Sequence, residues 1–303
     1  MGGDHRSSVW TFTGLYNVDM GGRDEIDLGN GFFLSKPTPS LLSVRSRVDL
    51  SGIQFDEMGA LRRFLIHRQR LPRVRGPERE KKINHFQNGL MALQVLKPLK
   101  TFGFIFQASE SGKDRLNLEQ LCARPPIYPA HWAGPRSFDT EFISQVPAVI
   151  KSILRVKRET AAEPKNAIDL LQLGLEHFHP LLKGLLCVMG LEAALGGRGR
   201  NDFRKRLCDC LGESTHVFPD WNSPFHQPPP YTVGRIAVDL FMLRNMIAHG
   251  ISLREAAQDK KTPVDLLKNV QVMQGSPSIA YCLLLSEAAI YLLCAVIRKK
   301  VLA

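Results

Sequence analysis

Residues 244–250 read Arg-Asn-Met-Ile-Ala-His-Gly and place an arginine and a histidine five positions apart near the end of an apolar helical segment. The His249 imidazole can carry a proton near neutral pH, and the Arg244 guanidinium can hold an anion through paired N–H donors. Burying such groups in hydrocarbon costs free energy. Their presence therefore requires either a buried hydrogen-bonded partner or a functional surface at the helix end.

The second half of the chain, which must position these two residues, is predicted to be helical. Helices are expected over residues 140–157, 166–195, 202–211, 233–249 and 278–302. Leucines recur at three- and four-residue steps within 166–195, the stripe by which an amphipathic helix packs into a bundle. Gly196-Gly197 is expected to end that helix, and the motif helix is expected to begin near Tyr231-Thr232.

The first half of the chain has a mixed pattern. Strands are expected around residues 9–12, 25–28, 31–34, 47–50 and 101–106, and helices over 57–69 and 83–96. Gly29-Asn30-Gly31 predicts a tight hairpin turn, because glycine and asparagine tolerate positive φ. Prolines between residues 125 and 135 interrupt regular structure. The predicted fold class is α+β, with a mixed α/β N-terminal domain over 1–139 and an all-α helical bundle over 140–303.

Composition limits the class of protein. The chain has 303 residues, 44% of them hydrophobic, so it can bury a sizeable core and is expected to hold two domains. Its net charge of +11 favours polyanionic partners, although a solvated basic face would carry the same charge. Six cysteines lack Cys-x-x-Cys spacing and are interpreted as buried thiols in a reducing compartment.

One apolar segment, residues 279–297, is long enough to span a bilayer. Glu287 near its middle would cost about 2.5–3.5 kcal/mol in a lone span, whereas a central bundle helix can be apolar nearly all round. We therefore expect a bundle helix and no membrane partner. The polar first residues do not resemble a secretory signal, so the expected location is cytoplasmic.

Other motifs do not predict a metal or cofactor. The histidines at 177 and 179 would point about 200° apart on a helix, and the cysteines at 208 and 210 share this spacing. Walker-type and Gly-x-Gly-x-x-Gly loops are missing from the sequence, and the glycine-rich residues 196–200 follow a helix instead of a strand. No cofactor and no metal are therefore expected.

Residues 244–250, together with Gly-Leu-Glu-Ala-Ala-Leu at 190–195, resemble the HEPN superfamily and most of all its ApeA-like branch. In that family an arginine followed after four to six residues by a histidine marks the active site, and the residue after the arginine is often polar, as Asn245 is. The resemblance covers roughly residues 160–303. Around residues 26–31 the first half is also similar to the N-terminal region that ApeA-like proteins often carry.

This resemblance implies an HEPN-like bundle that forms a homodimer and cleaves RNA without a metal ion, as a toxin or antiviral defence effector. Two copies of Arg244 and His249 would meet across a two-fold cleft. RNA supplies its own nucleophile, the 2′-hydroxyl, so His249 would carry the proton and Arg244 would hold the phosphate. Asn245 would orient the imidazole or the phosphate. The products would carry a 2′,3′-cyclic phosphate.

Two basic tracts are candidates for binding the RNA. The first candidate lies in the helical half and comprises Arg198, Arg200, Arg204, Lys205 and Arg206. It follows the helix end at 190–195, although a solvated face would show the same charges. The other tract, within 62–82, could bind RNA, bind a partner or face solvent. The N-terminal half is the expected seat of sensing, through an antitoxin or a trigger partner.

Two alternatives stay open. On an ideal helix Arg244 and His249 lie about 140° apart, whereas Asn245 and His249 share a face. Arg244 could instead be a buried arginine paired with Glu192 or Asp239, and His249 could be a helix cap favoured by the helix dipole. The alternative function is a non-catalytic HEPN module that dimerises or binds RNA and carries a regulatory N-terminal domain.

Overall fold

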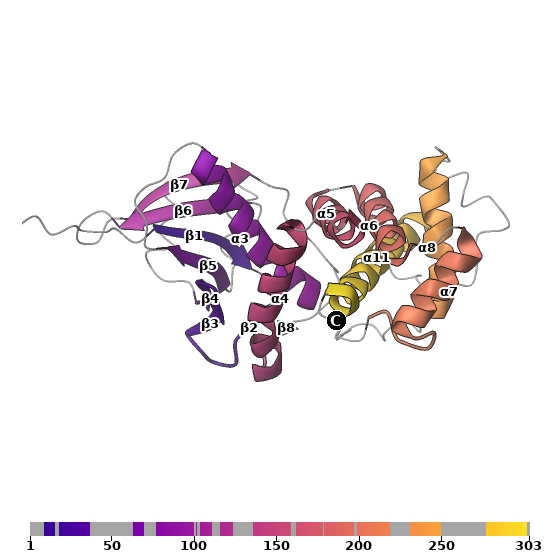
Figure 1. Cartoon of the computed structure of the whole chain (residues 1–303), viewed down its shortest axis with the longest axis horizontal. Coiled ribbons are helices and arrows are strands. Elements are labelled where there is room, and N and C mark those ends of the chain that lie inside the picture. Colours follow the sequence, from indigo (N-terminus) through magenta and orange to yellow (C-terminus); the bar gives the residue numbers. More distant parts are fainter. Residues whose placement is uncertain are drawn as a thin grey trace, which may run out of the picture. The chain divides into compact units, whose positions relative to one another are not determined.

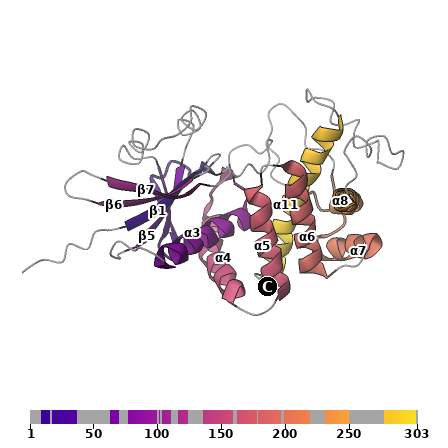
Figure 2. The ribbon, with the colours of Figure 1, turned by 90° about the horizontal axis from the view of Figure 1, so that it is seen from above.

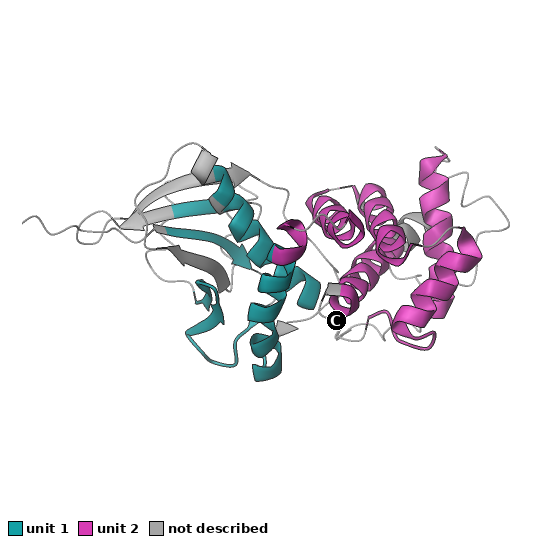
Figure 3. Ribbon diagram, in the orientation of Figure 1, with its two compact units in different colours: residues 1–128, 135–154 teal, residues 129–134, 155–303 magenta. Residues whose placement is uncertain are grey.

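The computed structural model describes residues 9–15, 18–36, 63–69, 77–99, 101, 104–110, 116–123, 136–158, 162–177, 179–196, 199–218, 231–249 and 277–301. The chain divides into two compact units (Figure 3). Unit 1 comprises Met1–Tyr128 and Pro135–Leu154, and unit 2 comprises Pro129–Gly134 and Arg155–Ala303. The described strands all lie in unit 1, whereas unit 2 is described as helices, so the fold class is α+β.

Six strands form the antiparallel sheet of unit 1, in the order β3-β4-β5-β1-β6-β7 (Figure 1). They are β1 (Val9–Leu15), β3 (Glu25–Gly29), β4 (Phe32–Ser35), β5 (Arg63–Gln69), β6 (Phe104–Glu110) and β7 (Leu116–Ala123). β1 is central because it pairs with both β5 and β6. A separate parallel pair is formed by β2 (Val18–Asp19) and β8 (Arg136–Ser137).

Helix α3 (Pro77–Leu96) lies against one face of this sheet (Figure 2). Gly89 allows the close approach, because a Cβ atom there would lie 2.3 Å from the Phe32 ring of β4. Phe32 and Phe86 are fully buried at this contact, with ring centroids 6.2 Å apart. The end of α3 is fixed by Gln94, whose side chain donates to the Leu99 carbonyl at 2.8 Å and accepts from the Leu99 N–H at 2.7 Å.

The predicted hairpin between β3 and β4 is confirmed. Gly29, Asn30 and Gly31 have φ values of 77°, 52° and 79°, the left-handed region that glycine and asparagine tolerate. The Asp27 carboxylate accepts the Gly29 N–H at 2.8 Å. A Cβ atom at Gly29 would also lie 3.0 Å from the Pro147 ring of α4 (Thr140–Arg158). Backbone conformation and packing therefore both favour glycine at this position.

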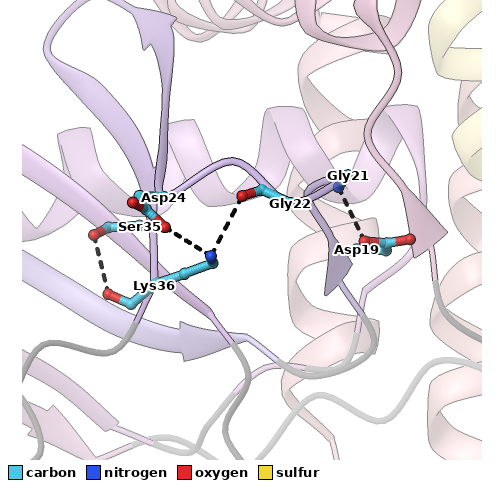
Figure 4. Close-up of polar contacts among 6 residues, drawn as sticks. All are labelled: Asp19, Gly21, Gly22, Asp24, Ser35 and Lys36. Atoms are coloured by element: carbon cyan, nitrogen blue, oxygen red, sulfur yellow. Dashed lines mark hydrogen bonds and ion pairs between the residues drawn. The ribbon is translucent and has the colours of Figure 1, made fainter.

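Polar contacts organise the turn that leads from β2 into this hairpin (Figure 4). The Asp19 carboxylate accepts the Gly21 N–H at 3.0 Å. Lys36 pairs with Asp24 at 2.6 Å and donates to the Gly22 carbonyl at 3.3 Å. The Asp24 side chain is 88% exposed, so this ion pair contributes at most about 1 kcal/mol. These contacts fix the local turn geometry.

The helix predicted over residues 57–69 is wrong where the structure describes it, because residues 63–69 form β5. This strand pairs with β1 on one side and with β4 on the other. Hydrogen bonding to two neighbours outweighs local helix preference, which is a weak determinant. Of the strand predicted over 101–106, the structure describes Phe104 onward as part of β6 and Thr101 as a bridge to Leu15, and β7 was not expected. The strand predicted over 47–50 lies outside the described residues.

Helix α4 contributes to both units, because one of the divisions between them falls between Leu154 and Arg155, within the domain predicted over 140–303. In unit 1, its Phe142 ring meets Phe138 edge-on at 4.3 Å. In unit 2, Lys157 donates to Gln172 of the next helix at 3.0 Å.

Unit 2 is described as a bundle of helices that packs around α11 (Figures 1 and 2). Its members are α5 (Ala162–Glu176), α6 (Pro180–Leu195), α7 (Arg200–Leu211), α8 (Val233–Ala248) and α11 (Pro277–Val301). From Leu284 to Ile297, α11 is buried except at Ala295, as a central helix requires. Across the described parts of the chain, no helix combines the length and apolar character needed to cross a membrane.

The single helix predicted over 166–195 is two helices. Pro180 occupies the first turn of α6, and His179 before it is extended, with φ −74° and ψ 117°. Proline lacks an N–H and disfavours a helical conformation in the preceding residue, so the helix is interrupted before Pro180. The predicted leucine stripe is divided as a result, and Leu182 is 41% exposed. The predicted helix end at Gly196 is confirmed, with φ 68°.

We predict that Gly89→Ala destabilises the protein by about 1–3 kcal/mol, because the added methyl group overpacks the contact with Phe32. Asn84→Ala, at an exposed position of the same helix, is the matched control and should change stability by less than about 0.5 kcal/mol. Urea unfolding followed by circular dichroism measures both. Equal unfolding midpoints for Gly89→Ala and wild type would contradict the proposed contact.

Candidate functional site

Helix α8 carries the candidate site and is anchored at its start. Thr232 is its N-terminal cap residue, as predicted, and the Val233 N–H donates to the Thr215 carbonyl at 2.9 Å. Just before it, the Val217 N–H donates to the Tyr231 carbonyl at 2.9 Å. Backbone bonds to the segment after α7 therefore determine where α8 begins, and its length then places residues 244–249 at its far end.

Arg244 forms an ion pair with α6. Its Nε lies 3.3 Å from Oε2 of Glu192, and its Nη1 donates to Oδ1 of Asn245 at 2.8 Å. The guanidinium carbon also lies 5.9 Å from the centre of the Phe241 ring. Of the two acidic partners expected for a buried arginine, Glu192 and Asp239, the structure therefore shows Glu192.

The Arg244 guanidinium remains partly open. A guanidinium has five N–H donors, and the Glu192 and Asn245 contacts use one on Nε and one on Nη1. Three donors on Nη1 and Nη2 have no partner among the described residues. The Arg244 side chain is 35% exposed and that of Glu192 is 19% exposed. The group is thus held on one side and accessible to an anion on the other.

His249 caps α8 and is exposed. Its backbone N–H donates to the Asn245 carbonyl at 3.0 Å, and its φ of −95° and ψ of 6° end the helix. Within the described part of the chain, its ring has no hydrogen-bond partner. The imidazole is therefore available to a ligand or to another chain.

Asn245 links the two halves of the motif. Its side-chain oxygen accepts from Arg244, and its backbone oxygen accepts from His249 one turn later. No contact joins Arg244 to His249 among the described residues of this one chain. This agrees with the separation of about 140° between Arg244 and His249 that is expected on a helix turning about 100° per residue. Arg244 instead contacts the side chain of its neighbour Asn245.

Two arginines of the predicted RNA-binding tract make structural contacts. Arg204 donates through Nε to the Gly234 carbonyl at 3.2 Å and pairs through Nη2 with Glu213, so it holds the first turn of α8. Arg206 donates through Nη1 to the Leu195 carbonyl at 3.0 Å, where it satisfies a carbonyl at the end of α6. It also bonds Asp202 through Nε at 3.0 Å.

The other members of that tract differ. Arg198 lies outside the described residues. Arg200 and Lys205 are exposed on α7, and neither has an ion pair within the described ranges. These two side chains are the part of the tract that the structure leaves accessible to a polyanion.

The sequence analysis named Glu192 only as an alternative structural partner of Arg244, and it did not name Phe241. A signal for Glu192 was present, because it is the only charged residue between Gly184 and Leu195. A lone carboxylate in such an apolar helix needs a partner. Phe241 carried no comparable signal, since a buried aromatic residue is typical of any helix core.

The interior of unit 2 also holds titratable groups. Burial lowers the pKa of Lys183, opposed by Cys187 and Glu287 nearby. Burial raises the pKa of the Cys294 thiol to about 12 and also raises that of Cys187. Both thiols are therefore protonated and unreactive at neutral pH. The described cysteines, which also include the half-exposed Cys208 and Cys210, form no disulfide with one another.

The described residues contain no group of three or more histidine, cysteine, aspartate or glutamate side chains that could hold a metal ion. Comparisons of the chain with known protein families, curated proteins and solved structures found no match. The HEPN resemblance therefore stays a prediction from residues 190–195 and 244–250.

We predict that Arg206→Ala lowers the free energy of unfolding by about 0.5–1.5 kcal/mol, because it removes the bonds to Leu195 and Asp202. Lys205→Ala removes the same charge from the neighbouring exposed position and should have almost no effect. Thermal unfolding of the three proteins tests this difference. A loss of stability in Lys205→Ala as large as that in Arg206→Ala would count against the capping role.

We predict that Lys183→Met removes a pH dependence of stability that the buried Lys183 gives the wild type. The folded-state pKa of Lys183 is below its usual value, so the unfolded state binds more protons between the two values. Wild-type stability should therefore rise with pH in that window, and the variant should lose this increase. Urea unfolding at pH 7 and pH 10 measures this rise in stability for both proteins. An equal rise in stability between pH 7 and pH 10 in Lys183→Met and in wild type would contradict the prediction.

Proposed function

We propose that unit 2 is a metal-independent endoribonuclease of HEPN type that acts as a homodimer. The observation that supports this proposal is the arrangement at the end of α8. Arg244 is held by Glu192 and Asn245 and keeps three N–H donors on its exposed side, and the ring of His249 is exposed beside Asn245. A phosphate binder and a proton carrier thus lie at one helix end.

The proposed reaction uses the 2′-hydroxyl of RNA as nucleophile. A base must remove its proton, an acid must protonate the departing 5′-oxygen, and positive charge must stabilise the phosphorane. One imidazole can serve as base or as acid, and a second copy of the chain supplies the other. Arg244 supplies the charge, because a guanidinium stays protonated and donates paired hydrogen bonds to phosphate oxygens. Asn245 holds Arg244 through its side chain and His249 through its backbone, and so fixes where the two residues lie.

The proposal extends to the role of the whole chain. A ribonuclease of this kind acts as a toxin or as an antiviral effector in the cytoplasm, and unit 1 senses the trigger or binds an antitoxin. The positive net charge of +11 is consistent with a polyanionic substrate. Arg200 and Lys205 are the exposed cations of α7 through which unit 2 would contact that substrate.

A second candidate is a non-catalytic module that dimerises or binds RNA. The Arg244–Glu192 ion pair favours it, because a carboxylate neutralises the guanidinium and satisfies its burial without any ligand. The separation of Arg244 from His249 within one chain also fits this candidate. It predicts RNA binding or self-association without strand cleavage.

We predict that the purified protein cleaves a labelled RNA in EDTA and leaves a 2′,3′-cyclic phosphate. His249→Ala and Arg244→Ala should each reduce the rate by at least about 100-fold, the usual effect of removing a proton carrier or an oxyanion donor. His216→Ala is the matched control, since His216 is an exposed histidine of unit 2 outside α8. Denaturing electrophoresis and mass spectrometry of the products provide the measurement.

The same samples distinguish the two candidates. RNA that stays intact with wild type, but shifts in a binding assay, supports the non-catalytic module. Cleavage that survives in both His249→Ala and Arg244→Ala would instead point to a contaminating nuclease. Light scattering of the wild type tests the homodimer, and a monomer at all concentrations would remove the two-fold site from the mechanism.

A further inference from the structure

Glu192 on α6 is the carboxylate that contacts Arg244, and nothing in the proposed reaction requires a carboxylate. We infer that Glu192 is a positioning residue, which sets the orientation of the Arg244 guanidinium for the phosphate; this inference rests on the proposed function. Glu192 itself touches neither substrate nor proton in this scheme. Its role is to decide which edge of Arg244 faces outward.

The contacts of Arg244 define its orientation. Glu192 binds Nε at 3.3 Å, and Asn245 binds Nη1 at 2.8 Å. Because the guanidinium is planar and rigid, an ion pair at one nitrogen and a hydrogen bond at another restrict rotation of the whole group. The Phe241 ring, 5.9 Å from the guanidinium carbon, limits its remaining freedom. A flexible side chain is thereby confined, and the directions of its three other donors are fixed with it.

The support for Glu192 is itself rigid. Glu192 lies in the last turn of α6, where its carbonyl accepts the Gly196 N–H at 2.8 Å. Arg206 ties the same helix end to α7 through the Leu195 carbonyl at 3.0 Å. Two residues before Glu192, Gly190 lets Leu293 of α11 approach so closely that a Cβ atom would lie 2.6 Å from it. Cap, arginine and close packing thus hold the carboxylate in place.

Removing the charge of Glu192 distinguishes a role in positioning Arg244 from a role in binding RNA. A carboxylate beside Arg244 lowers the local positive potential and so weakens the attraction for RNA, whereas a fixed guanidinium stabilises the transition state. Removing only the charge of Glu192 should therefore reduce kcat without raising KM. A residue needed only for folding would instead reduce the amount of active protein and the unfolding temperature together.

The test compares Glu192→Gln, Arg244→Ala and the double variant with wild type, using full-length protein. Glu163→Gln is the matched control, because it removes the same charge from an exposed glutamate in the first turn of α5, elsewhere in unit 2. We measure kcat and KM for RNA cleavage in EDTA. We also measure the Kd for an oligonucleotide methylated at every 2′-oxygen, which lacks the nucleophile and stays intact. Thermal unfolding shows whether each variant is folded.

We predict that Glu192→Gln lowers kcat by about 10- to 100-fold, the range for a misplaced catalytic group, while KM does not rise. Glu163→Gln should leave kcat within about twofold of wild type. In the Arg244→Ala background, Glu192→Gln should cause no further loss, because its effect passes through Arg244. An equal loss in both backgrounds, or equal kcat for the two glutamine variants, would overturn the inference.

A wild type that does not cleave RNA would refute the proposed function, and binding would then decide the inference separately. Positioning is supported if Glu192→Gln changes the Kd for the methylated RNA only when Arg244 is present. It is refuted if the four proteins bind equally, or if the change is the same with and without Arg244.

Discussion

The close packing of α6 against α11 determines how unit 2 is arranged. A Cβ atom at Gly184 would lie 2.7 Å from the Ser286 hydroxyl, and one at Gly190 would lie 2.6 Å from Leu293. Side chains larger than glycine would push the helices apart at both points. A Cβ atom at Gly184 would also lie 3.2 Å from Cδ2 of Leu243 in α8. The same small residues therefore bring α8 and its Arg244 to the surface of α6 that bears Glu192.

Much of the charge in this unit has a structural role. Arg204 and Arg206 satisfy backbone carbonyls and carboxylates at helix ends, which a solvated basic face would not do. Arg244 is paired with a carboxylate and still exposes donors. The net charge of +11 thus overstates the charge available to a polyanion, because part of it is neutralised within the fold. Which arginines remain accessible depends on helix packing.

Local sequence patterns predicted turns and helix ends correctly where a single residue type constrains the backbone. The hairpin turn at Gly29-Asn30-Gly31, the helix end at Gly196 and the start of α8 at Thr232 all follow from conformational preferences of the chain within a few residues. The break at Pro180 was equally local but was obscured by the continuous leucine pattern across it. β5 could not be recognised, because its strand conformation comes from pairing with β1 and β4, which are distant in sequence.

The sequence by itself determined which residues of this protein could do chemistry. Arg244, Asn245 and His249 lie within seven consecutive residues, 244–250, with a spacing that is unusual for an apolar helix. Only the tertiary structure decided what each of them contacts. Glu192 lies 52 positions before Arg244 in the sequence, and the two side chains form an ion pair because α6 and α8 pack together. Side-chain partners across helices depend on packing distances of a few ångströms, which local patterns do not encode.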